Sequence, residues 1–213
     1  MSKTLSLVVM ISGNGSNLQS IIDAIEAGRL NANIASVVSN NTSAYGLMRA
    51  KNHQLPTQVI DHRNYADRDQ FDRAIGKLLR DIDPDFVVLA GFMRILGAEL
   101  IASFKNRILN IHPSLLPAYK GLNTHRRALE NGEHEHGVSI HLVTAELDDG
   151  PVLLQGRYPI DASDDVESLQ RKGHNLEHHM YPQLLSWLSD GDISIENDNI
   201  LHHQLPMKQP VEI

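Results

Sequence analysis

Two polar side chains at the end of an apolar run are the residues best suited to chemistry. Asn110 lies in a short, mainly apolar segment, residues 107–111, which leads into His112 and then Pro113. Proline cannot continue a central strand and keeps the preceding residue out of the helical region, so we expect His112 at a strand end. On extended backbone, side chains two residues apart point to the same side, so the amide and the imidazole should converge.

This pair of side chains suits acyl transfer. An amide NH2 and a protonated imidazole can hold a carbonyl oxygen that gains negative charge, and an imidazole can also move a proton near neutral pH. The spacing is equally compatible with a structural role, in which Asn110 caps a turn and His112 hydrogen-bonds a loop. The acidic segment 146–151 could supply a carboxylate partner through Asp148, although its composition is that of a turn, which alone would explain this residue.

The elements around this pair predict an α/β fold. The apolar, β-branched run 86–90 is typical of a strand buried on both faces, as in parallel sheets covered by helices. Strand patterns at 5–11, 34–38 and 56–60 alternate with helix patterns at 18–27, 43–53 and 67–82. We therefore expect a doubly wound, mostly parallel sheet with right-handed crossovers.

The later part of the chain predicts an antiparallel addition to that sheet. Strand patterns at 137–143 and 152–158 flank the acidic turn, helix patterns cover 123–131 and 163–190, and Pro182 should kink or break the second helix. Residues 191–213 are polar and predict a loosely packed, irregular tail. We expect one domain, 1–190, with a phosphate-binding half of about 1–105 and a catalytic half of about 106–190.

A glycine-containing loop, residues 12–17, stands between the first strand and the first helix. Glycines let the backbone approach an anion, and a helix N-terminus offers free N–H groups, so the loop predicts a phosphate site, with a plain tight turn as the alternative. It lacks the third glycine of a dinucleotide fingerprint and the Gly-Lys-Ser/Thr of a Walker loop. Arg68, at another helix start, opposes the helix dipole and serves either a ligand or the solvated surface.

Composition narrows the class of protein. With 213 residues and 41% hydrophobic content, the chain can bury one large core. The absence of cysteine excludes disulfides, thiol catalysis and thiolate metal sites. A net charge of −7 argues against extended nucleic-acid binding but allows a local basic pocket for phosphate. The charge therefore favours small-molecule substrates. The first apolar run is too short for a membrane span and lacks a signal-peptide cleavage pattern, so we expect a cytoplasmic protein.

The histidine clusters do not predict a metal centre. Pairs stand at 134 and 136, at 178 and 179, and at 202 and 203. Adjacent histidines diverge on a helix, and none of the pairs has His-Glu-x-x-His spacing or an obvious third ligand. We therefore expect no metal, no nucleic acid and no membrane partner.

Taken together, the motifs resemble one family, the folate-dependent phosphoribosylglycinamide formyltransferases. The resemblance runs from about residue 5 to residue 190. Asn-x-His with a downstream Leu-Asp-x-Gly-Pro is typical of folate formyltransferases as a class, and the glycine loop and single-lobe length select this family. The stretches that carry it are ISGNGSNLQSII, VVLAGFMRIL, RILNIHPSLLPAYKGLNTHRRALENGEHEHG and VSIHLVTAELDDGPVLLQ.

The resemblance implies a formyltransferase fold and a specific reaction. The formyl group of the co-substrate 10-formyltetrahydrofolate would pass to the amine of 5-phosphoribosylglycinamide, in de novo purine (IMP) biosynthesis, by direct amine attack and without a metal. The family's catalytic trio falls on Asn110, His112 and Asp148. Asn110 and protonated His112 would then stabilise the oxyanion, and Asp148 would keep His112 protonated.

The resemblance also assigns the binding residues. Gly15, Ser16 and Asn17 fall on the loop for the ribosyl phosphate, and Glu177 on a further substrate contact. The positions that contact the formylfolate are Arg68, Met93, Arg94, Ile95, Leu96 and Asn110. Two positions depart from the family pattern: Asn123 stands where a histidine is expected, and Ala145 where an acidic residue is usual.

Three rival functions remain open, and the assembly is expected to be a monomer or a homodimer. A methionyl-tRNA formyltransferase would need a second, basic RNA-binding domain, for which the chain is too short and too acidic. A formylfolate hydrolase would use the same trio on water, but its relatives carry an N-terminal domain for which there is no room before Leu5. A non-catalytic nucleotide-binding module would explain the glycine loop and leave the trio idle.

Overall fold

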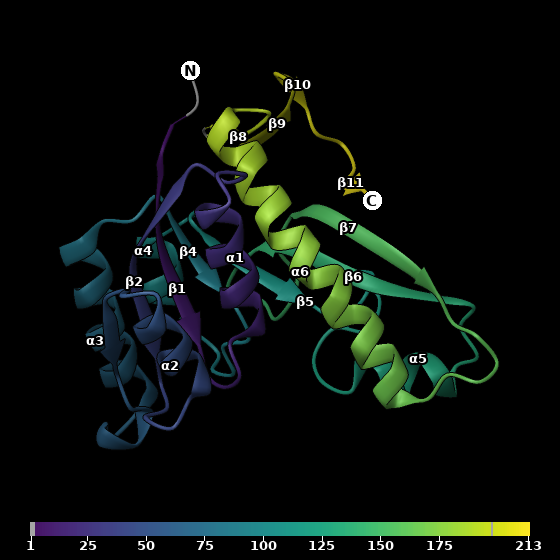
Figure 1. Ribbon diagram of the computed structural model, residues 1–213, viewed down its shortest axis with the longest axis horizontal. Helices are drawn as coiled ribbons and strands as arrows, with labels where there is room; N and C mark the ends of the chain where they lie inside the picture. The colour runs from purple at the N-terminus through teal and green to yellow at the C-terminus, as the bar shows by residue number, and fades with distance from the viewer. Residues whose placement is uncertain (1–2, 197) are drawn as a thin grey trace.

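The computed structural model describes residues 3–196 and 198–213, and within them the fold centres on one large sheet (Figure 1). The sheet has eight strands in the order β11-β7-β6-β5-β4-β1-β2-β3. Pairing is parallel from β3 to β5 and antiparallel between β5, β6 and β7. The strands are β1 (Leu5–Ile11), β2 (Ala32–Ser39), β3 (Thr57–Val59), β4 (Phe86–Leu89), β5 (Ile108–His112), β6 (Glu135–Leu142), β7 (Val152–Pro159) and β11 (Val211–Glu212). The predicted doubly wound sheet with an antiparallel addition is confirmed.

Helices cover both faces of the sheet. Side chains of α1, α2 and α6 pack in one apolar cluster, and those of α3 and α4 pack in a second one on the opposite face. In Figure 1, the long α6 lies beside α1 in front of the sheet. The helices are α1 (Ser16–Glu26), α2 (Tyr45–Asn52), η1 (His62–Asn64), α3 (Arg68–Ile82), α4 (Ala98–Ser103), α5 (Thr124–Glu130) and α6 (Val166–Asp190).

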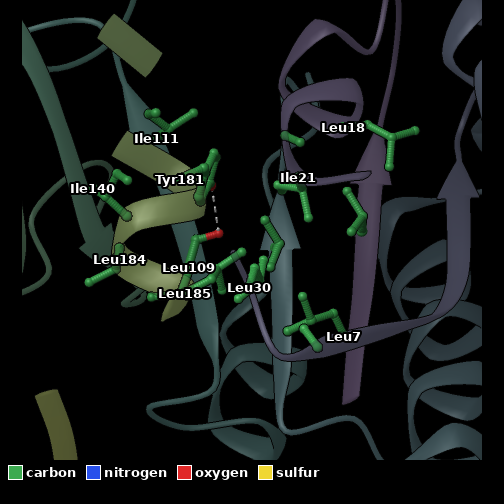
Figure 2. Packing of buried hydrophobic residues seen from close by; sticks show 14 of the residues in the cluster. Leu7, Leu18, Ile21, Leu30, Leu109, Ile111, Ile140, Tyr181, Leu184 and Leu185 are labelled. Carbon is green, nitrogen blue, oxygen red and sulfur yellow. Dashed lines mark hydrogen bonds between the residues drawn. The ribbon is translucent and has the colours of Figure 1, made fainter. Parts of the chain in front are cut away.

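The two apolar clusters explain why the central strands are apolar throughout. Alternate side chains of β1 enter different clusters, with Leu7 and Val9 under α1 and α6 and Val8 and Met10 under α3 and α4. Figure 2 shows the first cluster, in which Tyr181 of α6 lies among leucine and isoleucine side chains of the strands and α1. The Tyr181 hydroxyl, which is fully buried, donates to the Leu89 carbonyl at 2.7 Å and fixes α6 to the sheet.

The prediction of an irregular tail is wrong. In the described part of residues 191–213, β8 (Ile193–Glu196), β9 (Asn199–His202) and β10 (Leu205–Pro206) form a small antiparallel sheet, and β11 pairs with β7. Lys105 and Asn106 also bind the carboxylate of Asp198, which fastens this sheet to the domain. These strands are two to four residues long, too short to show the alternation by which strands are recognised in a sequence.

Two further elements differ from expectation. Helix α4 had no predicted counterpart. Helix α6 is 25 residues long and runs through Pro182 without interruption, so the predicted break is absent. Buried side chains on either side of Pro182, Tyr181 and Leu184 among them, hold both halves of α6 against the sheet. Within the described residues, no helix is long and apolar enough to cross a membrane.

The chain crosses over in the middle of the parallel strands. After β1 it turns to β2 and β3 on one side, and it then returns to β4 and β5 on the other. The loops after β1 and β4 are joined there, because Ser12 N donates to Gly91 O at 3.2 Å and Met93 N donates to Ser12 Oγ at 2.8 Å. In open α/β sheets, ligands bind in the crevice at such a switch point.

Candidate active site

Asn110 lies on the face of β5 turned away from α6. Leu109 and Ile111 pack under α6, so the alternating side chains of Asn110 and His112 point to the opposite face. In the antiparallel register Asn110 stands opposite His141 of β6, and its Nδ2 lies 3.1 Å from His141 Nε2. His141 Nδ1 lies 2.9 Å from the Leu142 carbonyl, so Nδ1 carries the hydrogen and Nε2 accepts from the amide of Asn110. Burial lowers the pKa of His141, which keeps the ring neutral.

His112 has an acceptor at each ring nitrogen. Nδ1 lies 3.3 Å from Asp148 Oδ2, and Nε2 lies 2.9 Å from the Tyr119 carbonyl. The carbonyl can only accept, so Nε2 carries a hydrogen, and a hydrogen on Nδ1 as well would face the carboxylate. The side chains of His112 and Asp148 are 7% and 9% exposed, so the pair is largely withdrawn from water. The carboxylate of Asp148 is therefore placed to pair with a protonated His112 ring.

The three side chains expected to form the catalytic trio therefore meet in one place. His141 joins them, because its Nε2 lies 3.1 Å from Asn110 Nδ2 and 3.7 Å from Asp148 Oδ1. Sequence reasoning missed His141. The alternation of 137–143 indicated its strand, but only the register between β5 and β6 places it opposite Asn110.

The glycine loop has the conformation of an anion site at a helix N-terminus. Gly15 adopts a left-handed conformation (φ 74°) as the N-cap of α1 and, being glycine, brings no capping side chain to its first N–H groups. A Cβ on Gly15 would lie 2.7 Å from the Cα of Gly46, so the backbones of these two glycines approach too closely for a side chain on Gly15. Asn17 Nδ2 donates to Glu177 Oε2 at 2.7 Å and links the loop to α6. Burial raises the pKa of Glu177, while the bond from Asn17 opposes the shift.

A cleft of about 400 Å³ opens beside this loop, between α1, α2 and α6. Its lining includes Ser16, Arg49 and His178 but no member of the trio, so this cleft is separate from the trio. The trio instead lies on the opposite face of the sheet from α6, where the acidic loop after β6 folds over it.

The segment after β4 presents an apolar and cationic surface. Met93 and Ile95 are 72% and 60% exposed, and Arg94 is exposed between them. Leu96 is buried in the core, so it supports the segment rather than facing solvent. Arg68, in the first turn of α3, reaches the same place, since its Nη2 would lie 3.7 Å from a Cβ built on Gly97.

A buried carboxyl group anchors that segment. Asp72 Oδ2 accepts from Gly97 N at 2.6 Å, at the N-terminus of α4. Burial raises the pKa of Asp72, while the bond from Gly97 and the charges of Arg68 and Arg94 oppose the shift. Arg68 and Arg94 therefore both place positive charge near Asp72, beside the exposed apolar side chains.

The two departures from the family pattern lie in loops near the trio. Asn123 is the N-cap of α5 in a left-handed conformation (φ 60°), which asparagine adopts more readily than most residues. Ala145 is exposed on the acidic loop that carries Asp148. In the described part of the chain, no group of three or more His, Asp or Glu side chains is arranged to hold a metal ion.

Comparison with known proteins identifies the class to which this fold belongs, the formyl transferases. The sequence pattern of the formyl transferase family matches residues 5–185, and the chain belongs to that family. The match to known phosphoribosylglycinamide formyltransferases is close. The chain is 45% identical to the Escherichia coli enzyme over 197 residues, covering 91% of this chain and 92% of that one. It is 39% identical over 199 residues to the human trifunctional purine biosynthetic protein adenosine-3, covering 93% of this chain and 20% of that one.

Solved structures agree with the sequence matches. The phosphoribosylglycinamide formyltransferase of Coxiella burnetii superposes with a TM-score of 0.93 at 45% identity, covering 99% of this chain and all of that one. A formyltetrahydrofolate deformylase from Pseudomonas syringae shares the fold, with a TM-score of 0.85 at 24% identity and coverage of 94% and 66%. The expected resemblance and fold are confirmed, and the homologues support formyl transfer in purine biosynthesis.

Proposed function

We propose that this enzyme transfers the formyl group of 10-formyltetrahydrofolate to the amine of 5-phosphoribosylglycinamide, in de novo purine biosynthesis. The observation that carries the proposal is the meeting of Asn110, His112 and Asp148 in one largely buried place. The names of the relatives, which are 45% and 43% identical to this chain, support the choice of the amine substrate.

Asn110 and His112 would act on the formyl oxygen. As the amine nitrogen bonds to the formyl carbon, negative charge develops on that oxygen, and hydrogen-bond donors already in place stabilise it. His141 takes one N–H of the Asn110 amide and so leaves the other free. His112 offers a positive charge beside it, which Asp148 stabilises at 3.3 Å.

Proton movement completes the exchange. The bond between the formyl carbon and the folate nitrogen breaks, and the proton lost by the attacking amine replaces the formyl group on that nitrogen. An imidazolium can donate a proton to the departing nitrogen and later regain one, which assigns the relay to His112. The overall reaction needs no oxidant, covalent intermediate or metal.

The binding residues would sit on two sides of this centre. Gly15, Ser16 and Asn17 would hold the ribosyl phosphate at the N-terminus of α1, with Glu177 as a further substrate contact. The formylfolate has flat rings and a tail bearing carboxylates. The exposed apolar side chains of the segment 93–96 suit the rings, and its arginine together with Arg68 suits the carboxylates.

The test is a formyl-transfer assay with purified variants. We expect Asn110→Ala and His112→Ala to lower turnover by roughly 100- to 1000-fold, because each removes a donor from the developing oxyanion. Asp148→Asn should also lower turnover and alter its pH profile. His134→Ala, which removes an exposed histidine at the start of the β6 hairpin, should leave the rate unchanged.

Omitting the amine substrate separates the rival functions. Transfer that requires 5-phosphoribosylglycinamide supports the proposal. Release of formate without it would favour the hydrolase, and tight binding of a phosphate ligand without turnover would favour the nucleotide-binding module. Near-parental activity of Asn110→Ala or His112→Ala would refute the assigned mechanism.

A further inference from the structure

A three-residue stretch of backbone, Tyr119 to Gly121, contacts both members of the His112–Asp148 pair. The carbonyl of Tyr119 accepts from His112 Nε2 at 2.9 Å, and the amide of Gly121 donates to Asp148 Oδ2 at 3.0 Å. The same carboxylate oxygen lies 3.3 Å from His112 Nδ1. One short loop therefore contacts the imidazole at Nε2, the ring nitrogen that does not face Asp148, and also contacts the carboxylate oxygen that faces His112.

The backbone of this stretch has an unusual conformation. Tyr119 and Gly121 both have positive φ, at 56° and 78°. Glycine adopts such angles freely, but a tyrosine does so only where surrounding contacts impose them, and such residues concentrate at functional sites. In this conformation the Tyr119 carbonyl faces His112 and the Gly121 amide faces Asp148.

Side chains of the neighbouring α5 region hold the stretch in place. Arg127 Nη1 donates to the Lys120 carbonyl at 2.7 Å, and its guanidinium lies 5.2 Å from the centre of the Tyr119 ring. The Tyr119 hydroxyl donates to Glu133 at 2.5 Å and accepts from Asn131 at 2.9 Å. The loop is thus fixed by contacts that do not touch the trio.

We propose that residues 119–121 form a backbone clamp that positions His112, with Arg127 and the Tyr119 side chain as its supports. The inference rests on the proposed function, because it gives the clamp a role in turnover through His112. With Nε2 held by a carbonyl, the Nδ1 edge must face Asp148. Without that anchor, the ring could rotate about its broad terminal torsion and place a carbon atom against the carboxylate.

The first experiment compares Arg127→Ala with Arg126→Ala. Arg126, its neighbour in α5, is exposed, and its side chain makes no hydrogen bond or ion pair within the described residues, so it matches the charge change without binding the clamp. We expect Arg127→Ala to lower kcat by roughly tenfold with both KM values nearly unchanged, as for a lost orientation rather than lost binding. Arg126→Ala should retain the parental kcat.

A second pair of variants tests the backbone itself. Gly121→Ala adds a Cβ whose nearest neighbour is Leu147 at 3.9 Å, so its effect comes from the strained φ alone. Gly28→Ala is the matched control, because Gly28 has a similar φ of 68° with nothing within 4 Å of a Cβ, and it follows α1 far from the trio. Gly121→Ala should show the same kcat loss, and Gly28→Ala should not.

Nitrogen-detected NMR of the imidazole rings gives a readout independent of activity. A ring N–H bonded to a buried carbonyl exchanges slowly with water, and the His112→Ala variant identifies which signal belongs to His112. We expect this signal in the parent and in both controls, and its broadening or loss in Arg127→Ala, Gly121→Ala and Tyr119→Phe. Tyr119→Phe keeps the ring stacked on Arg127, so it remains informative if the other variants unfold.

The outcomes separate the clamp from the proposed function. If Arg127→Ala and Gly121→Ala match their controls in kcat and keep the ring signal, while His112→Ala loses activity, the clamp is wrong and the function stands. If His112→Ala itself retains activity, the proposed function fails whatever the clamp variants do. A rise in KM without a fall in kcat would also overturn the clamp.

Discussion

A histidine pair behind the active site should make the enzyme lose stability in mild acid. His125 of α5 and His136 of β6 pack edge to face, with ring centres 5.1 Å apart. His125 Nδ1 and His136 Nε2 are buried without a protein hydrogen-bond partner. Burial, aided by the neighbouring histidines, lowers the pKa of His125 to about 4, and burial also lowers that of His136. We predict that His125→Gln weakens the acid sensitivity of the fold.

The sign follows from proton uptake on unfolding. Between its ordinary value of 6.5 and about 4, His125 is neutral in the folded protein and protonated in the unfolded chain. The unfolded state therefore binds one more proton, and the free energy of unfolding falls by up to about 1.4 kcal/mol for each pH unit of acidification. The whole interval sets a ceiling of about 3 kcal/mol. Because the ring is only partly buried and solvent screens its charge, we expect about 1–2 kcal/mol between pH 6.5 and 5.

The measurement is urea unfolding of parent and variant from pH 7.5 to 5. The His125→Gln protein should show a shallower fall of unfolding free energy below pH 6.5, whatever its stability at pH 7.5. His134→Gln, which removes an exposed histidine nearby, is the control and should keep the parental slope. Equal slopes for the parent and His125→Gln would refute the assignment of acid sensitivity to this pair.

Two further predictions concern the sheet and the glycine loop. Tyr181→Phe removes the buried hydrogen bond to Leu89 and should lower the free energy of unfolding by about 1–3 kcal/mol in urea, and an unchanged midpoint would contradict this. Gly46→Ala places a Cβ 2.4 Å from Ile11 Cδ1 and 3.2 Å from Gly15 Cα, so the Ile11 side chain must move and the glycine loop must give way by a few tenths of an ångström. It should raise KM for phosphoribosylglycinamide by roughly tenfold while leaving KM for the formylfolate nearly constant, and equal rises in both would show general damage instead.

Much of the fold could be predicted because its strands are buried on both faces. The apolar, β-branched runs of β1 and β4 and the periodic face of α3 each carry their signal within one element. Helix α4 carries none, because it has only six residues and begins where Gly97 bonds to Asp72, 25 positions earlier in the chain. The C-terminal strands likewise depend on pairing between short segments.

In the candidate site, too, some residues could be predicted from their own segment, whereas others depend on contacts between distant segments. Spacing alone placed Asn110 and His112 on one side of a strand. The residues alone left Asp148 open between a turn residue and a carboxylate partner, and the family resemblance decided for the second. His141 depended on register. The Tyr119 carbonyl is a backbone group that every residue type provides, and the Gly121 amide is one that every type except proline provides. A pattern of side chains cannot indicate which of these groups will face a histidine.

The position of β5 in the sheet explains why loops, and not a helix, cover its polar residues Asn110 and His112. It pairs in parallel with β4 and antiparallel with β6, so it is the boundary between the two halves of the sheet. Leu109 and Ile111 pack under α6, and on the other face Ile108 packs with α3 and α4. Further along that second face, Asn110 meets His141 of β6 and His112 meets groups of two loops. A covering helix would keep its N–H and C=O groups in its own hydrogen bonds, whereas a loop can direct them at side chains. The clamp at residues 119–121 uses this freedom, which is why the site should be more sensitive to loop backbone conformation than to the packing beneath it.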